Sequence, residues 1–560
     1  MQRLSGLDAS FLYLETPSQL LHVCGVILLD PETIPGGYSF PEFKDELERR
    51  ITDVPMFHRR LKQVPLGIDH PVWVEDDDFD IDRHVHRMAL PTPGGERELA
   101  DLCGHMAGIP LDRSRPLWEF VVIEGLESGK VAVFTKMHHC TVDGVSGANA
   151  ISFLCSLEPD APPLETAPKG RPPREPGDAE LLARGVVANL AKPVQLAKLA
   201  APTAGVLTKT IGRARKGTAM AAPLTAPRTS FNATITGHRT IAIGDLSLAK
   251  IKEIKNAVEG ATVNDVVIAL SGGALRRYLE ERGELPETSL LASVPVSVHG
   301  ESKKTGGSNK VSTIFSRLCT DVVDPLERLS QVAESNTNAK EHHRAIPADT
   351  LQDWAEFAAP RTFGLAVRMV SSLRLADTGP VIHNLVISNV PGPPVPLYFM
   401  GAKIEGLYPL GPVFHGAGLN ITVMSSDGKV HVGAIACREL VPRPWKLVEK
   451  FPEELEALHA AVRRTAEPAS TKNTATKATA KKSSARKSSA RKASTKKAST
   501  KKTSATRGAS KQTAAKKATG TKATGKKATG KKPTAAKAGA QKTPSRKAAT
   551  SAGAAAAASA

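Results

Sequence analysis

The stretch MHHCTVDGVSG, residues 137–147, decides how the fold of this chain is interpreted. It follows residues 131–135, whose alternating apolar spacing predicts a β-strand. A histidine at the end of a strand can present its imidazole to a substrate. Neutral imidazole accepts a proton near neutral pH, and a hydroxyl must lose that proton when it attacks an ester or thioester carbonyl. The stretch therefore indicates a general-base histidine and a strand that positions it.

Two other chemistries are open to the cluster of His138, His139 and Cys140. A structural zinc site would need spaced ligand pairs such as CxxC or HxxxH, and no second pair is visible. A covalent mechanism could use Cys140 or Ser146, but the GxSxG pattern of a nucleophile elbow is missing. We therefore expect no metal, and the family resemblance described below implies direct attack by an acceptor hydroxyl without a covalent acyl-enzyme.

The charge of the chain is divided unequally along its length. Of 75 Lys and Arg residues, 25 lie in residues 471–560, which contain no Asp or Glu. Residues 1–470 therefore carry 50 basic and 56 acidic residues, a net charge of −6. The basic segment also lacks Val, Ile, Leu, Met, Phe, Trp and Tyr, so it cannot bury enough apolar surface to order itself. We expect an acidic globular body and a disordered basic tail.

The cysteines and the apolar runs bear on the compartment of the protein. The six cysteines show no CxxC pair and no regular spacing, which favours a reducing compartment. The N-terminal residues lack the apolar core of a signal peptide, and no apolar run reaches the roughly 18 residues of a spanning helix. We expect a soluble or peripheral body.

Strands and helices alternate irregularly in both halves, which predicts an α/β fold with a mixed sheet in each half. The composition divides the chain into a first domain (1–158), a linker (159–229), a second domain (230–464) and the tail (465–560). Strands are expected at 22–29, 119–123, 131–135, 293–298, 310–318 and 384–389, a hairpin at 419–437, and helices at 43–51, 147–157, 246–257, 262–279 and 325–341.

The linker contains an unusual basic stretch, Ala179–Met220, with apolar residues at helical spacing and no acidic residue after Glu180. We favour a crossover helix that packs between the domains. The alternative is a helix that lies on an anionic membrane surface.

Four motifs, taken together, resemble one family. The HHxxxDG pattern of residues 138–144 is similar to that of the chloramphenicol acetyltransferase-like superfamily. The segment PLW (116–118) precedes this pattern, and NDVV (264–267) and SNVPGP (388–393) come after it. Their order is that found in the bacterial wax ester synthase/diacylglycerol acyltransferase family. The resemblance spans roughly residues 1–464 and implies two chloramphenicol acetyltransferase-like domains with the active site in a tunnel between them.

The resemblance also implies roles in catalysis. His139 would be the general base and His138 its support, while Asp143 would pair with an arginine and hold the loop. Asn264 would orient His139 and the substrate, although an Asn there could equally cap a helix.

Three further residues are expected to contact the substrate. Trp118 would line the acyl channel, with a place in the core as the alternative. Gly144 would permit the turn after the motif, and Asp265 would accompany Asn264.

The reaction implied by the resemblance is acyl transfer from acyl-CoA, as co-substrate, to the hydroxyl of diacylglycerol or a long-chain alcohol, without a cofactor. One alternative is a condensation-type enzyme that uses carrier-bound substrates. The other is a nucleoid or scaffold protein that acts through its tail.

The linker and tail suggest partners beyond the substrates. Their basic residues would hold a cytoplasmic protein at the inner face of the plasma membrane or on lipid inclusions. Binding of the tail to nucleic acid, with a steep dependence on salt, is the alternative. The sequence leaves the oligomeric state open.

Overall fold

The computed structural model describes residues 2–52, 54–142, 154–161, 174–190, 193, 220–297, 311–344 and 360–466. All the described residues belong to one compact unit, residues 1–476. Asp143, Gly144, most of the linker and the basic tail lie outside the described residues, so the predictions for them are not tested.

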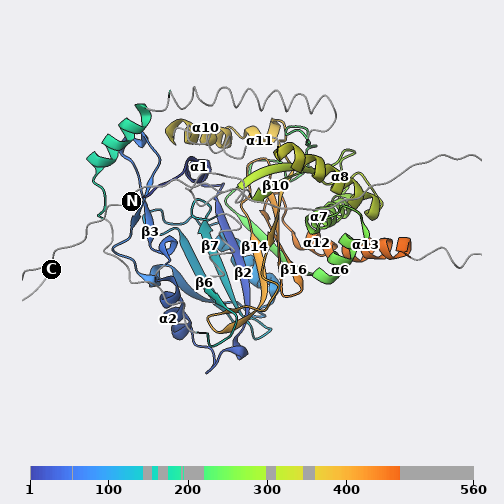
Figure 1. Ribbon diagram of the computed structural model, residues 1–560, viewed down its shortest axis with the longest axis horizontal. Helices are drawn as coiled ribbons and strands as arrows, with labels where there is room; N and C mark the ends of the chain where they lie inside the picture. Colours follow the sequence, from blue (N-terminus) through green and yellow to red (C-terminus); the bar gives the residue numbers. More distant parts are fainter. Residues whose placement is uncertain are drawn as a thin grey trace, which may run out of the picture. The chain divides into compact units, whose positions relative to one another are not determined.

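The first large sheet contains the strand that leads into the histidine pair (Figure 1). This strand is flanked on both sides by antiparallel neighbours, and all eight of its residues are buried, including the polar Thr135, Lys136 and His138. The strands predicted at 22–29, 119–123 and 131–135 are confirmed. In spatial order the sheet comprises β5 (Val85–Ala89), β6 (Trp118–Glu124), β7 (Val131–His138), β2 (His22–Asp30), β14 (Ala402–Leu410), β13 (Tyr398–Phe399) and β8 (Cys155–Ser156).

The second large sheet is mixed, as predicted. Its strands β10, β12 and β15 run parallel, and the remaining neighbours are antiparallel. The predicted hairpin turns through Asp427 and Gly428, both with positive φ (41° and 80°), as a type I′ turn requires. In spatial order the sheet comprises β11 (Val311–Arg317), β10 (Leu291–Ser297), β12 (Leu385–Pro391), β15 (Leu419–Ser426), β16 (Lys429–Cys437) and β9 (Arg239–Ser247).

Strand β14 ties the two halves of the chain together. It comes from the second half but pairs antiparallel with β2 in the first sheet, with Tyr408 opposite Val26. The mixed sheet of the first half is therefore completed by a strand that the sequence reading had assigned to the second segment. A small third sheet orders β1 (Gln2–Arg3), β4 (Val72–Glu75) and β3 (Arg59–Lys62).

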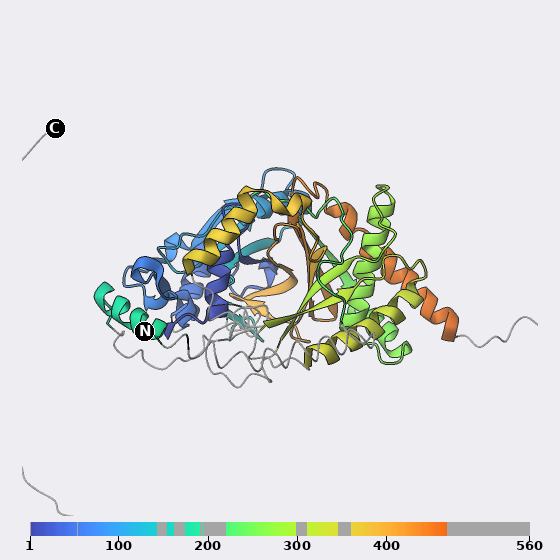
Figure 2. The ribbon, with the colours of Figure 1, turned by 90° about the horizontal axis from the view of Figure 1, so that it is seen from above.

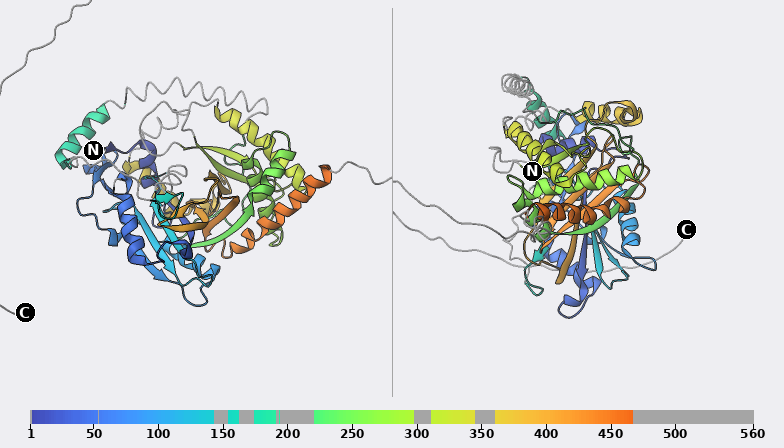
Figure 3. Two further views of the ribbon diagram at one scale, coloured as in Figure 1. Left: turned by 60° about the horizontal axis from the view of Figure 1, so that its bottom comes forward. Right: turned by 90° about the vertical axis from the view of Figure 1, so that its right-hand side faces the viewer.

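Helices cover the outer face of the second sheet and bury a continuous apolar core against it (Figures 2 and 3). They are α6 (Leu248–Ala257), α7 (Val263–Glu280), α8 (Pro325–Arg344), α12 (Trp445–Val448) and α13 (Lys450–Ala466). The other helices are α1 (Gly6–Leu14), α2 (Phe40–Ile51), α3 (Glu96–Ala107), α10 (Pro360–Ser372), α11 (Leu375–Thr378), a helix over residues 178–190, and the 3-10 turns Pro31–Thr33, Pro55–Phe57, Pro65–Gly67 and Ile81–Arg83.

Two helix predictions need correction. The helix predicted over 147–157 does not reach its expected end, because Cys155–Ser156 form β8 and pair with β13. The helix predicted from residue 246 begins at Leu248, since Ser247 caps it by accepting a hydrogen bond from the Lys250 N–H. In both places pairing or capping by neighbouring groups decides the boundary.

All six cysteines are free. Within the described ranges, no helix is both long and apolar enough to cross a membrane.

Candidate active site

A cavity of about 360 Å³ lies between the two large sheets. Its wall is formed by β2 and β14 on one side and by β10, β12 and β15 on the other. Most of the lining is apolar, which suits an acyl chain, and a few polar side chains interrupt it. The polar or ionisable lining residues include His139, Thr135, Tyr408, Ser388, Asn389, Asn420 and Thr422.

His139 stands at the end of β7 and lines this cavity. Its backbone N–H donates to the Leu21 carbonyl at 2.8 Å, which fixes the chain just past the strand. Its imidazole stacks on the ring of Phe11, with centroids 4.0 Å apart and planes 11° from parallel. Phe11 also lines the cavity, so the stack fixes the imidazole plane at the wall.

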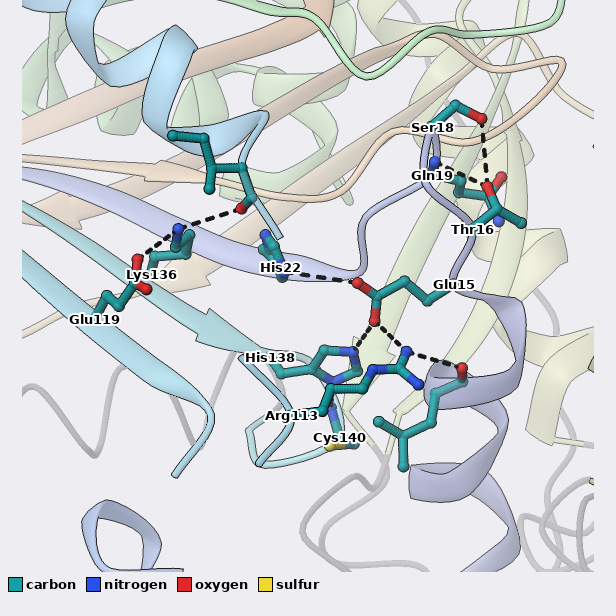
Figure 4. A network of polar contacts seen from close by, with 12 residues as sticks. Glu15, Thr16, Ser18, Gln19, His22, Arg113, Glu119, Lys136, His138 and Cys140 are labelled. Atoms are coloured by element: carbon teal, nitrogen blue, oxygen red, sulfur yellow. Dashed lines mark hydrogen bonds and ion pairs between the residues drawn. The ribbon is translucent and has the colours of Figure 1, made fainter. Parts of the chain in front are cut away.

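His138 is buried in the protein rather than exposed at the cavity, because successive residues of a strand point to opposite faces. Its Nδ1 accepts the backbone N–H of Cys140 at 3.1 Å. The proton of the neutral ring must therefore sit on Nε2, which donates to Glu15 Oε2 at 2.7 Å (Figure 4). Burial lowers the pKa of His138, in keeping with this neutral tautomer.

Glu15 is the carboxylate at the centre of this network (Figure 4). It accepts a second hydrogen bond from the guanidinium of Arg113 at 2.6 Å, and its other oxygen lies 3.8 Å from Nε2 of His22. Burial alone would raise the pKa of Glu15. The hydrogen bond from His138, together with the hydrogen bond and positive charge of Arg113, instead lowers the pKa to about 2.

The network holds the residues on both sides of His139. His138 is fixed to Glu15, and Cys140 is fixed through its N–H to His138. His139 lies between them and is therefore held through its two neighbours. These contacts are those expected if His138 supports His139, which stays a prediction, and they add Glu15 as the partner of His138.

Sequence reasoning missed Glu15, Arg113, Phe11 and His22. Glu15 and His138 are 123 positions apart, and Glu15 simply follows an apolar helix in the sequence. No local pattern pairs them. The one usable signal was an acidic residue directly after the apolar face of residues 6–14.

Trp118 lies in the core of the first half. It is 2% exposed, its indole N–H donates to the Phe57 carbonyl at 2.9 Å, and its ring stacks on His84 at 4.5 Å. It is not among the residues that line the described cavity.

Asn264 and Asp265 lie in the first turn of α7, where Thr262 is the N-cap. Asp265 is 2% exposed and closes a capping box with Thr262, while its other oxygen accepts the side-chain amide of Asn336 at 2.7 Å. Neither residue lines the described cavity. By contrast, Ser388 and Asn389 of the SNVPGP segment do line it.

A search for metal ligands within the described ranges finds no group of three or more His, Cys, Asp or Glu residues that could hold an ion. What the described site offers is an oriented imidazole at the wall of an apolar cavity. Such a group can take a proton from a hydroxyl that is bound beside an acyl chain.

Two mixed sheets with a cavity between them are the arrangement of the chloramphenicol acetyltransferase-like class, which the resemblance predicted. The wax ester synthase/diacylglycerol acyltransferase catalytic domain matches residues 4–267, and the C-terminal domain of the same family matches residues 307–459. The chain therefore belongs to the wax ester synthase/diacylglycerol acyltransferase family, as its motifs predicted.

Named relatives agree with this assignment. A putative diacylglycerol O-acyltransferase of Mycobacterium tuberculosis (strain CDC 1551 / Oshkosh) is 47% identical over 462 residues, which cover 82% of this chain and 90% of the relative. A probable diacylglycerol O-acyltransferase of the same strain is 36% identical, over 81% of this chain and 98% of the relative. The wax ester synthase/diacylglycerol acyltransferase structure from Marinobacter aquaeolei VT8 is similar with a TM-score of 0.58 and 32% identity, over 82% of this chain and all of that one.

Proposed function

We propose that this protein transfers a long-chain acyl group from acyl-CoA to the hydroxyl of diacylglycerol, forming triacylglycerol and free CoA. Long-chain alcohols, which would give wax esters, are the second class of acceptor. The observation that carries the proposal is the imidazole of His139, stacked on Phe11 at the wall of an apolar cavity between two sheets. Family membership and the names of the relatives support the choice of substrates.

In this reaction His139 takes the proton of the acceptor hydroxyl while the hydroxyl oxygen attacks the thioester carbonyl. The tetrahedral intermediate then collapses, the C–S bond breaks, and the imidazolium returns the proton to the sulfur of CoA. An ester and free CoA leave, and His139 is neutral again. The atoms balance without a cofactor or a metal.

Direct transfer is favoured over a covalent acyl-enzyme through Cys140. The side chain of Cys140 is fully buried, and burial raises the pKa of its thiol well above the usual value. Because the thiolate is the reactive form, this thiol is a poor nucleophile at neutral pH.

The roles implied for the other predicted residues complete the proposal. Asp143 would hold the loop through an arginine, and Gly144 would allow the turn after it. Asn264, accompanied by Asp265 at the start of α7, would orient His139 and the substrate. Trp118, buried beside Phe57 and His84, would act on the shape of the site.

We further propose that the protein works at a lipid surface, because its acceptor is a lipid. The 25 basic residues of 471–560 would add attraction to anionic headgroups. Binding of this tail to nucleic acid is the alternative. In that case the protein would bind DNA in the absence of vesicles, with an affinity that falls steeply as the salt concentration rises.

The decisive experiment measures release of CoA from palmitoyl-CoA by the full chain, with diacylglycerol or hexadecanol as acceptor. Replacement His139→Ala should lower kcat about 10²- to 10⁴-fold, as expected for loss of a positioned general base. His459→Ala is the matched control, because His459 lies on α13 and pairs only with Glu253 at 2.7 Å. Equal, acceptor-dependent release by the His139 variant would refute the proposal.

A further inference from the structure

Helix α10 turns an apolar stripe toward solvent. Leu365, Met369 and Leu373 are 61%, 51% and 62% exposed. They are spaced four residues apart, which places them in one line along a helix. The Leu373 N–H donates to the Met369 carbonyl at 2.9 Å, so the helical turn continues through the last of the three. We call these three residues the α10 stripe.

The surroundings of the stripe are also apolar and exposed. Val370 on α10 and Leu375 at the start of the adjoining helix α11 are 42% and 46% exposed. Single exposed apolar side chains are common, but a continuous row of large ones marks a surface that meets a partner or a membrane.

The opposite side of α10 packs on α1 (Figure 1). Helix α1 carries Phe11, which stacks on His139, and it ends just before Glu15, which holds His138. The stripe is therefore separated from the candidate active site by a single helix. A lipid layer bound there would be separated from the candidate active site only by α1.

The charge around the stripe fits an anionic partner. Residues 360–376 contain three arginines and no acidic residue. Arg368 lies exposed within α10, while Arg374 is paired with Asp377 at 2.6 Å. A second copy seated on the same face would bring exposed arginines together, which is unfavourable, whereas anionic headgroups would neutralise them.

We infer that the α10 stripe is a docking surface for an anionic phospholipid layer, with the three apolar side chains among the acyl chains and Arg368 at the headgroups. This is the arrangement of an interfacial amphipathic helix. The inference rests on the proposed function, because a lipid acceptor gives the surface its use. It differs from the expectation that the linker and tail alone make this contact.

The test is flotation of the full chain with vesicles of equal parts phosphatidylcholine and phosphatidylglycerol. At about 0.5 M NaCl the attraction of the basic tail is screened, whereas insertion of apolar side chains persists. The triple variant L365S/M369S/L373S should then float at least about ten-fold less than wild type. Since all three positions are exposed, its Tm should match wild type.

A matched control places the same change on another helix. Residues 178–190 are helical, and Val186, Val187 and Leu190 are 50%, 67% and 75% exposed. The variant V186S/V187S/L190S should float like wild type. If this control loses binding while the α10 variant keeps it, the linker helix is the docking surface and the inference is overturned.

Two other results would also overturn it. Unchanged flotation of the α10 variant at high salt excludes insertion of the stripe. A change from dimer to monomer in that variant, with unchanged flotation, assigns the face to contacts between copies.

Activity separates this inference from the proposed function. The α10 variant should lose transfer to diacylglycerol in vesicles but keep transfer to a water-soluble short-chain alcohol. If wild type transfers to neither acceptor, the proposed function fails, and the flotation result still decides the docking surface.

Discussion

The two sheets contribute different chemistry to the cavity between them. The first sheet and its helix α1 supply His139 and, behind it, the buried pair of His138 and Glu15. The second sheet supplies uncharged side chains, such as Ser388 and Asn389 from β12 and Thr422 from β15. From this difference we predict that proton transfer depends on the first sheet and that the choice of substrate depends mainly on the second.

This division has a physical reason. A buried charge needs close, fixed partners, and the first sheet provides them through β7, α1 and Arg113. An acyl chain needs only a dry, shaped surface, and the uncharged second wall provides that. Changes in the first sheet should therefore alter kcat, and changes in the second should alter the choice of substrate.

The strongest test of this division after His139 itself is Glu15→Gln. The variant keeps the size of the side chain but removes the charge that orients His138. We expect kcat to fall about ten- to a hundred-fold with KM changed little, because a small misplacement of the base is costly. Steady-state kinetics with palmitoyl-CoA and diacylglycerol measure both.

Glu454→Gln is the control for Glu15→Gln. Glu454 is another buried carboxylate that pairs with arginines, including Arg277 at 2.8 Å, but it lies on α13 among the outer helices. This variant should lose stability without a comparable loss of kcat. If both variants lose kcat equally, Glu15 is only a structural residue and the division fails.

A second prediction concerns stability at acid pH. The pKa of Glu15 is lowered from 4.5 to about 2, so its contribution to stability is complete above about pH 4.5 and is lost as the pH falls toward 2. Allowing for partial screening, we expect this to amount to about 2 kcal/mol. Urea unfolding of wild type and Glu15→Gln from pH 6 to pH 3 measures it. An identical decline in both proteins would contradict the assignment.

The smallest expected effect is a change in acyl-chain preference, caused by substitutions in the wall formed by β10, β12 and β15. Val390 of β12 is 6% exposed and lines the cavity. Val390→Phe should narrow the cavity and lower the preference for palmitoyl-CoA over octanoyl-CoA about three- to ten-fold, with kcat for the short substrate retained. Val390→Ala should shift the preference the other way. Equal changes for both substrates in both variants would show that this wall does not select chain length.

Local patterns predicted much of the fold. The strand before the histidine pair, the hairpin at Asp427 and Gly428, and the helix after Thr262 each carry a periodicity or a turn residue that acts over a few positions. The position of His139 at a strand end followed from the same kind of signal.

The rest depends on contacts between distant residues. Nothing near residues 402–410 indicates that they join β2, because strand pairing is decided by the assembled sheet. Glu15 was missed for the same reason, and the alternative of a core position for Trp118 could not be weighed without knowing that His84 and Phe57 surround it.

The pairing of β14 with β2 limits where the chain can be divided into fragments or recombined with a relative. Seven residue pairs join these strands, from Lys403 opposite Asp30 to Leu410 opposite Cys24. A fragment ending in the linker would leave β2 as an exposed edge strand. The complementary fragment would contain β14 without β2, the strand with which it pairs. Recombination between relatives should therefore exchange residues 22–30 and 402–410 together, as one inherited unit.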